Sequence, residues 1–266
     1  MDKRPIGIMD SGIGGLTVAK VLQRELPHES IVFVGDQERL PYGIRPVEEI
    51  QQFCLQIARF LLEYDIKLMI IACNTATAAA LEYLKAQLPI PVVGVISPGS
   101  HAALALPNHQ RIGVIATEKT IESQAYSKQI QALDPNSQVI GLACQEFVTL
   151  VEKNMMKTDH ARQVVAEKMQ FFNEHPVDAI IYGCTHFPLL QAEIQQALRT
   201  PIPLVDAGAA TAQFVKDQLI ALDGLSDAPK ARTWYFTTGD PIEFRNVAGQ
   251  WLENKMIDVS NIKLGD

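Results

Sequence analysis

Several features of other protein classes are absent from this 266-residue sequence. No run of about 18 apolar residues is present, as a transmembrane helix would require. The charged N-terminus also lacks the apolar segment of a signal peptide. We therefore expect a cytoplasmic protein that does not enter a membrane. Because the net charge is −7 and no run of lysine and arginine occurs, we expect no nucleic-acid partner.

Cysteines are few, and their spacing argues against two kinds of site. Cys54, Cys73, Cys144 and Cys184 form no CxxC pair and no Cys/His cluster at zinc spacing. Without a signal peptide, a disulfide framework is not expected in a chain of this length. The sequence therefore predicts free thiols and no bound metal.

Apolar sequence is plentiful, since 47% of the residues are hydrophobic and 20% are charged. Apolar runs of strand length lie at 5–9, 31–36, 67–72, 90–97, 111–117, 137–144, 177–183, 202–208 and 232–240. Segments of helical period lie between them, among them 16–26, 47–64, 190–198, 209–222 and 242–256. This alternation predicts the α/β class with mainly parallel sheets.

Two stretches of the chain resemble each other, LMIIACNTATAAA at 68–80 and AIIYGCTHFPLL at 179–190. Each reads as a buried strand that ends at a cysteine and is followed by small residues and a helix-like segment. We therefore expect two similar α/β lobes facing across a central cleft. Placing the crossover near Ser97–Gly99, where Pro98-Gly99 breaks a strand, and the return near Ala207–Gly208 predicts a discontinuous first lobe. That lobe would comprise 1–97 and 208–266, and the second 98–207.

Cys73 and Cys184 are the candidate reactive thiols. Both follow a predicted strand, where ligands bind in α/β folds, and His186 lies close enough to serve as the base or orienter of Cys184. A thiol at a helix N-terminus is expected to have a lowered pKa. Cys54, within a helix, and Cys144, in an apolar strand, are interpreted as inert core residues.

Two thiols on opposite sides of a cleft suit one reaction type better than others. A Cys/His hydrolase would leave the second thiol idle, and a dithiol redox site needs sulfurs close enough to bond. Inversion at a carbon acid needs two acid/base groups, one on each face. The ordinary thiol pKa of about 8.5 suits that task.

The DSGIGG segment at 10–15 is neither a dinucleotide fingerprint, because Thr17 replaces the third glycine, nor a P-loop. It is either a tight turn or a small-anion site made by backbone N–H groups and the Ser11 hydroxyl. In the second interpretation Asp10 faces a cation or a thiol.

The four motifs DSGIGG at 10–15, PYG at 41–43, ACNTA at 72–76 and GCTHFP at 183–188 together resemble the glutamate racemase family. The resemblance covers essentially the whole chain. It implies a homodimeric, cofactor-independent enzyme that interconverts L- and D-glutamate, the latter for peptidoglycan, between two α/β domains. Regulated members carry an N-terminal extension that the sequence does not show, so we expect no activation by a UDP-muramyl peptide.

The resemblance also implies roles for single residues. Cys73 is similar to the thiol that deprotonates D-glutamate, and Cys184 to the one that deprotonates L-glutamate. Asp10 resembles the acidic partner of the first thiol, and His186 lies beside the second. Substrate contacts are implied at Asp10, Ser11, Tyr42, Gly43, Asn74, Thr75, Thr185 and His186. Asp36 and Glu152 resemble catalytic acidic residues of the family's site, although either could be a solvated carboxylate.

Two alternatives remain open from the sequence. An aspartate or hydantoin racemase would share the two-thiol logic, and a non-catalytic small-anion-binding module would use the cysteines structurally. No lysine motif for pyridoxal phosphate is present. A racemase would therefore stabilise the carbanion by positioned donors, for which we expect Asn74, Thr75, Thr185 and backbone N–H groups.

Overall fold

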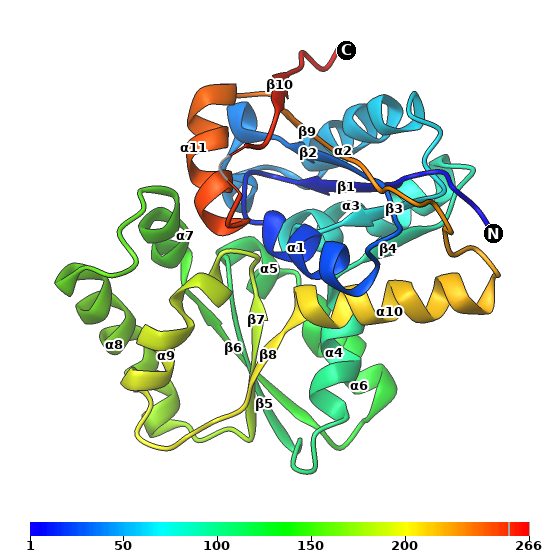
Figure 1. Cartoon of the computed structure of the whole chain (residues 1–266). Coiled ribbons are helices and arrows are strands. Elements are labelled where there is room, and N and C mark those ends of the chain that lie inside the picture. Colours follow the sequence, from blue (N-terminus) through cyan, green and yellow to red (C-terminus); the bar gives the residue numbers. More distant parts are fainter. Residues whose placement is uncertain (255, 266) are drawn as a thin grey trace.

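The computed structural model describes residues 1–254 and 256–265, and its helices and strands alternate along the chain (Figure 1). The strands are β1 (Ile6–Asp10), β2 (Ile31–Gly35), β3 (Leu68–Ile71), β4 (Val92–Gly94), β5 (Arg111–Ala116), β6 (Gln138–Ala143), β7 (Ala179–Gly183), β8 (Leu204–Asp206), β9 (Thr233–Thr237) and β10 (Val259–Asn261). The helices are α1 (Leu16–Glu25), α2 (Val47–Leu62), α3 (Asn74–Gln87), α4 (Ile96–Leu104), α5 (Glu118–Glu122), α6 (Ala125–Leu133), α7 (Gln145–Glu152), α8 (Asp159–Glu174), α9 (Gln191–Ala197), α10 (Ala207–Ala221) and α11 (Pro241–Trp251). Short 3-10 helices lie at η1 (Gln37–Arg39), η2 (Tyr42–Ile44) and η3 (Phe187–Leu190).

The strands form two sheets, one in each α/β lobe. The first has the order β10-β9-β2-β1-β3-β4 and the second the order β6-β5-β7-β8. All strand pairs among the described residues are parallel, so the expected α/β class is confirmed. Because β9 and β10 join the first sheet, that sheet draws strands from both ends of the chain. The exact lobe limits, 97/98 and 207/208, remain a prediction.

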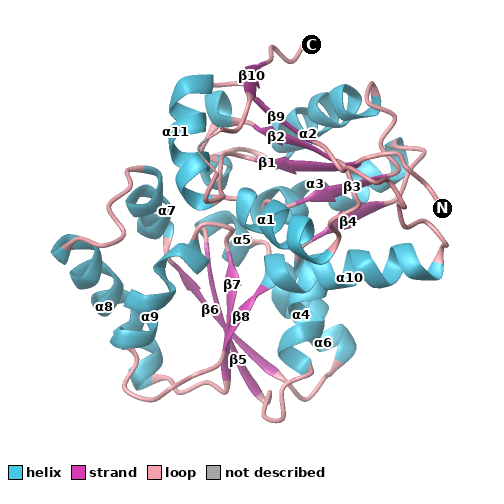
Figure 2. Ribbon diagram, viewed as in Figure 1, coloured by secondary structure: helices cyan, strands magenta, loops and turns pink. Residues whose placement is uncertain are grey.

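Alternation along the strands explains why helices cover both faces of each sheet (Figure 2). In β1, Ile6 and Ile8 pack into a core with α1, α10 and α11, whereas Met9 faces the core that contains α2 and α3. In β7, Ile180 packs with α7, α8 and α9, whereas Ile181 packs with α4 and α6. Each sheet is thus buried on both faces, as parallel sheets require.

Two expectations about elements were wrong, and one strand was missed. Pro98-Gly99 does not end a strand but lies inside α4, which begins at Ile96. A proline is tolerated there because first-turn N–H groups have no partner within a helix. The edge strand β10 was not predicted, because its three residues carry too short a pattern. Helix α11 ends at Trp251, before the expected end at 256, and residue 255 lies outside the described residues.

The parallel register places the carboxyl ends of neighbouring strands at the same edge. Met9 pairs with Ile71 in the first sheet, and Ala116 pairs with Gly183 in the second. The residues that follow these strands are therefore gathered at one edge of each sheet.

Within the described part of the chain, no helix combines the length and apolar character needed to cross a membrane.

Candidate active site

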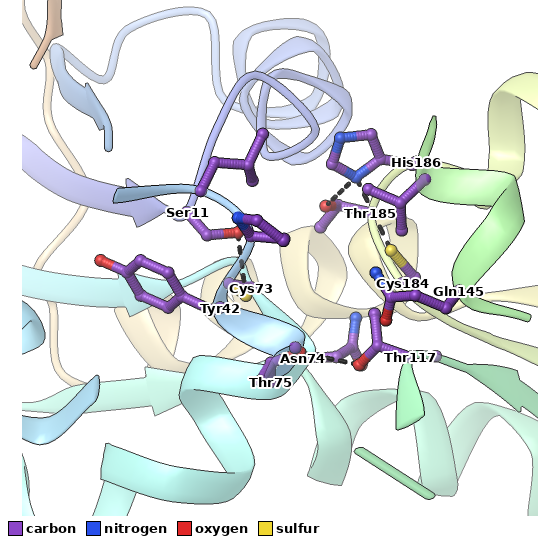
Figure 3. Close-up of a pocket in the computed structure, with 15 residues that line it drawn as sticks. Ser11, Tyr42, Cys73, Asn74, Thr75, Thr117, Gln145, Cys184, Thr185 and His186 are labelled. Carbon is purple, nitrogen blue, oxygen red and sulfur yellow. Dashed lines mark hydrogen bonds between the residues drawn. The ribbon is translucent and has the colours of Figure 1, made fainter. Parts of the chain in front are cut away.

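Residues that follow five strands line one cavity between the two sheets. Ser11 follows β1, Cys73 follows β3, Thr117 follows β5, Gln145 follows β6 and Cys184 follows β7. About 350 Å³ of empty space lies there, its mouth included. The complete lining is Ser11, Leu40, Pro41, Tyr42, Gly43, Cys73, Asn74, Thr75, Thr117, Gln145, Val148, Gly183, Cys184, Thr185 and His186. Figure 3 shows the thiols of Cys73 and Cys184 on opposite sides of this space.

Cys73 is the N-cap residue of α3. Its Sγ accepts a hydrogen bond from the Ala76 N–H at 3.4 Å and lies 3.4 Å from Ser11 Oγ. Burial, followed by the nearby charge of Asp10, raises the pKa of Cys73 to about 12, although both hydrogen bonds act to lower it. The expected lowering of this pKa at a helix N-terminus is therefore wrong, because desolvation outweighs the helix.

Asp10 lies behind the cavity wall and is fully buried. One carboxylate oxygen accepts from the Gly12 N–H at 3.0 Å, and the other accepts from the Thr185 hydroxyl at 3.4 Å. Burial raises the pKa of Asp10, and the charge of His186 acts against that rise. Asp10 thus connects the glycine turn of the first lobe with the cysteine loop of the second.

Cys184 has a histidine as its neighbour. Nδ1 of His186 lies 3.6 Å from Cys184 Sγ, and Nε2 of the same ring is hydrogen-bonded to the carboxylate of Glu152. Burial lowers the pKa of His186, but its bonds to Cys184 and Glu152 raise it by more, so the net pKa lies well above the ordinary value. The His186 ring therefore places a positive charge beside Cys184 Sγ.

Threonine hydroxyls from both lobes meet beside the cavity, which Thr75 and Thr117 line. Thr75 Oγ1, from α3, lies 2.9 Å from Thr117 Oγ1 and 3.3 Å from Thr120 Oγ1. The two second-lobe hydroxyls are themselves 3.0 Å apart. This cluster offers neutral donors to an anionic group without a basic side chain.

Tyr42 presents its ring to the cavity and its hydroxyl to Asp36. The hydroxyl donates to one Asp36 oxygen, and Thr238 Oγ1 donates to the other at 2.8 Å. The Arg39 guanidinium lies 2.7 Å from the same carboxylate. Asp36 is buried and does not line the cavity.

Two glycines permit the close approach of the lobes. A Cβ added at Gly14 would clash with Thr185 Oγ1 and would lie 2.6 Å from His186 Nδ1. A Cβ added at Gly43 would lie 2.8 Å from Gln145 Oε1. Any larger residue at either position would push a site residue of the second lobe away.

Residues 6–215 match the family model described as Asp/Glu/Hydantoin racemase. The chain belongs to this racemase family. Glutamate racemases from Levilactobacillus brevis and Limosilactobacillus reuteri are 47% and 46% identical to it. The alignments cover 99% and 100% of this chain and 96% and 99% of those relatives.

Solved structures agree with this assignment to the racemase family. A glutamate racemase isoform from Bacillus anthracis superposes with a TM-score of 0.96 at 38% identity, covering 99% of both chains. The glutamate racemase from Francisella tularensis, solved in complex with D-glutamate, superposes at 0.92 with 34% identity, again covering 99% of both chains.

Most residues predicted for the racemase site are brought together. Cys73, Cys184, Ser11, Tyr42, Gly43, Asn74, Thr75, Thr185 and His186 line the cavity. Asp10 and Glu152 lie one step behind it, against Thr185 and His186. Asp36 also lies behind the cavity wall, where it contacts the lining residue Tyr42 together with Arg39 and Thr238.

Sequence reasoning did not identify Leu40, Pro41, Thr117, Gln145, Val148 and Gly183 as cavity residues. Thr117 and Gln145 could have been found, because both follow predicted strands whose carboxyl ends carry site residues. Cys144, which precedes Gln145, is buried among apolar residues and is absent from the cavity lining.

All four cysteines are free thiols. No cluster of His, Cys, Asp and Glu side chains suited to a metal ion occurs in the parts of the chain that are described.

Proposed function

We propose that this amino-acid racemase interconverts L- and D-glutamate without a cofactor, using Cys73 and Cys184 as its two acid/base groups. The observation that carries the proposal is the pair of thiols facing one cavity from opposite sides. The names and identities of the full-length relatives support glutamate as the substrate.

In the L-to-D direction the Cys184 thiolate removes the α-proton, and the Cys73 thiol donates its proton to the opposite face of the carbanion. The D-to-L direction reverses both roles. One proton leaves the substrate and one returns, so charge and atoms balance. His186 stabilises the Cys184 thiolate, and Glu152 holds the imidazolium at Nε2. Asp10 acts on the Cys73 side by its charge.

Carbanion stabilisation is assigned to neutral donors. Asn74, Thr75 and Thr185 line the cavity beside the thiols, as do Ser11 and Gly43. Such donors stabilise developing charge most strongly where water is excluded. We expect alanine at both Thr75 and Thr185 to raise KM for glutamate, and an unchanged KM would count against neutral-donor recognition.

Asp36 is proposed as a positioning residue rather than a catalytic one. Its bond from the Tyr42 hydroxyl directs that ring toward the cavity, and its other contacts leave no oxygen directed at the substrate. Tyr42 and Gly43 then form the wall that faces Gln145 and Thr117.

Location and assembly are part of the same proposal. Four free thiols, two of them needed reduced, suit the reducing cytoplasm. The family resemblance supports a homodimer and a role in supplying D-glutamate for peptidoglycan. These points can be tested by fractionation, by sedimentation and by growth on added D-glutamate.

The decisive experiment compares turnover of D-glutamate and D-aspartate in D₂O. We expect turnover of D-glutamate, with deuterium at Cα of the L-product, and little turnover of D-aspartate. Preference for D-aspartate would mean that the enzyme is an aspartate racemase and not a glutamate racemase. Binding of either amino acid without exchange at Cα would favour the anion-binding module instead.

A further inference from the structure

We propose that Tyr126, a second-lobe residue, is a positioning residue that turns the Asn74 amide of the first lobe so that its N–H groups face the substrate. Tyr126 lies on α6 and is buried. Its hydroxyl donates a hydrogen bond to Asn74 Oδ1 at 2.7 Å. The inference rests on the proposed racemase function, which supplies a substrate carboxylate and a carbanion to be recognised.

Asn74 occupies a position where the direction of its amide matters. It is the first residue of α3, directly after Cys73, and it lines the cavity (Figure 3). Its Oδ1 accepts the hydrogen bond from Tyr126. Its Nδ2 makes no hydrogen bond to a described residue and keeps accessible surface. The two N–H donors of Nδ2 therefore open toward the cavity.

The direction of the amide follows from the chemistry of the tyrosine. A buried hydroxyl must donate its proton, and Asn74 Oδ1 is the acceptor that the described residues offer it. Burial also raises the pKa of Tyr126, so the hydroxyl stays protonated. A rotated amide would place Nδ2 against this donor and aim an oxygen at an anionic substrate.

Because of the hydrogen bond from Tyr126, the orientation of the Asn74 amide beside Cys73 depends on contact between the lobes. The segment from Thr117 to Tyr126 touches two consecutive residues of α3, Thr75 through its hydroxyls and Asn74 through Tyr126. Asn74 is thus oriented by the second lobe, although its backbone belongs to the first. Separation of the lobes would release the amide.

The test compares Tyr126→Phe with Tyr182→Phe. Both tyrosines are buried in the second lobe, but the Tyr182 hydroxyl makes no hydrogen bond to any described residue. We expect Tyr126→Phe to lower kcat/KM for glutamate about 10–100-fold, the usual consequence of leaving one buried polar group unpaired. The loss must be equal in both directions, because two enantiomers have an equilibrium constant of one. Tyr182→Phe should stay within about twofold of wild type.

A double-mutant cycle separates positioning from a merely structural role. If Tyr126 acts through Asn74, then Tyr126→Phe should add little to the loss caused by Asn74→Ala. Additive losses, or a Tyr126→Phe variant as active as wild type, would overturn the inference. Wild type that fails to racemise glutamate would instead overturn the proposed function.

A third variant keeps the test valid if Tyr126→Phe does not fold. Asn74→Asp retains the acceptor for Tyr126 but replaces the cavity-facing N–H groups with a carboxylate oxygen. We expect it to lose at least as much kcat/KM as Asn74→Ala. Activity near that of wild type would show that no donor of Asn74 faces the substrate, which contradicts the inference.

Discussion

The two cysteine loops follow equivalent strand ends, yet their thiols have different neighbours. Cys73 caps a regular α-helix and lies beside the Ser11 hydroxyl and near a buried carboxylate, Asp10. Cys184 is followed by a 3-10 helix and lies beside His186, which Glu152 holds from behind. One thiol therefore has a negative neighbour and the other a positive one.

The difference suggests how the two thiols divide the proton in the free protein. With its pKa raised to about 12, Cys73 carries a proton at neutral pH, whereas Cys184 has the positively charged ring of His186 beside it. This is the form that the proposed mechanism needs for L-glutamate. The reaction is therefore chemically symmetric, although the two thiols that carry it out have different neighbours.

The largest expected effect comes from removing either thiol. Cys73→Ser and Cys184→Ser should each lower kcat for racemisation by about 10²–10⁴-fold, the range for losing a general acid or base. The two losses should be comparable, because each direction needs both groups. Full activity in either variant, measured by circular dichroism of glutamate, would contradict the two-base proposal.

A smaller, one-sided effect is expected at Glu152. Glu152→Gln removes the charge that holds the His186 imidazolium and should lower kcat about 10–100-fold, as for a hydrogen bond to a charged group. Because the Cys184 step then limits the rate, the α-deuterium isotope effect should grow with L-glutamate but not with D-glutamate. If the isotope effect grew with both enantiomers, the assignment of Glu152 to the Cys184 step alone would be wrong.

Asp10→Asn should affect activity and stability in opposite directions. Activity should fall about tenfold through loss of a charged hydrogen-bonding group, with the isotope effect growing for D-glutamate. Burial raises the folded-state pKa of Asp10 above its reference value of 3.8. The native state then binds more protons than the unfolded state, so stability is lost as pH rises through the folded pKa.

Removing that carboxyl should therefore stabilise the fold at neutral pH. We expect Tm to be about 2–4 °C higher than that of wild type at pH 7.5, and the gap to narrow at pH 4. Differential scanning calorimetry at the two pH values measures both quantities. A Tm below that of wild type at pH 7.5 would show that ionised Asp10 stabilises the fold instead.

The sequence was sufficient for the features that depend on local pattern. Apolar runs located most strands, motifs at strand ends located the two thiols, and the resemblance to the racemase family implied most of the cavity wall. Features that depend on approach between distant segments were not predictable. The contact of Tyr126 with Asn74, and of Gln145 with Gly43, joins residues of different lobes. The raised pKa of Cys73 also arises from burial, which a motif does not encode.

The smallest expected effect concerns Cys144, which tests whether placement rather than thiol chemistry decides function. Like Cys73, Cys144 follows a strand and occupies an N-cap position. Burial raises its pKa to about 12, as it does for Cys73. Unlike Cys73, it is packed in the apolar core of the second lobe and does not line the cavity. Cys144→Ala should therefore keep kcat/KM within about twofold, while loss of the buried sulfur lowers the free energy of unfolding by about 1 kcal/mol. Racemisation assays and urea denaturation measure the two effects. A 100-fold loss of activity in a folded variant would mean that the pair of thiols has been assigned wrongly, because burial and strand-end position alone would then be enough to make a cysteine essential.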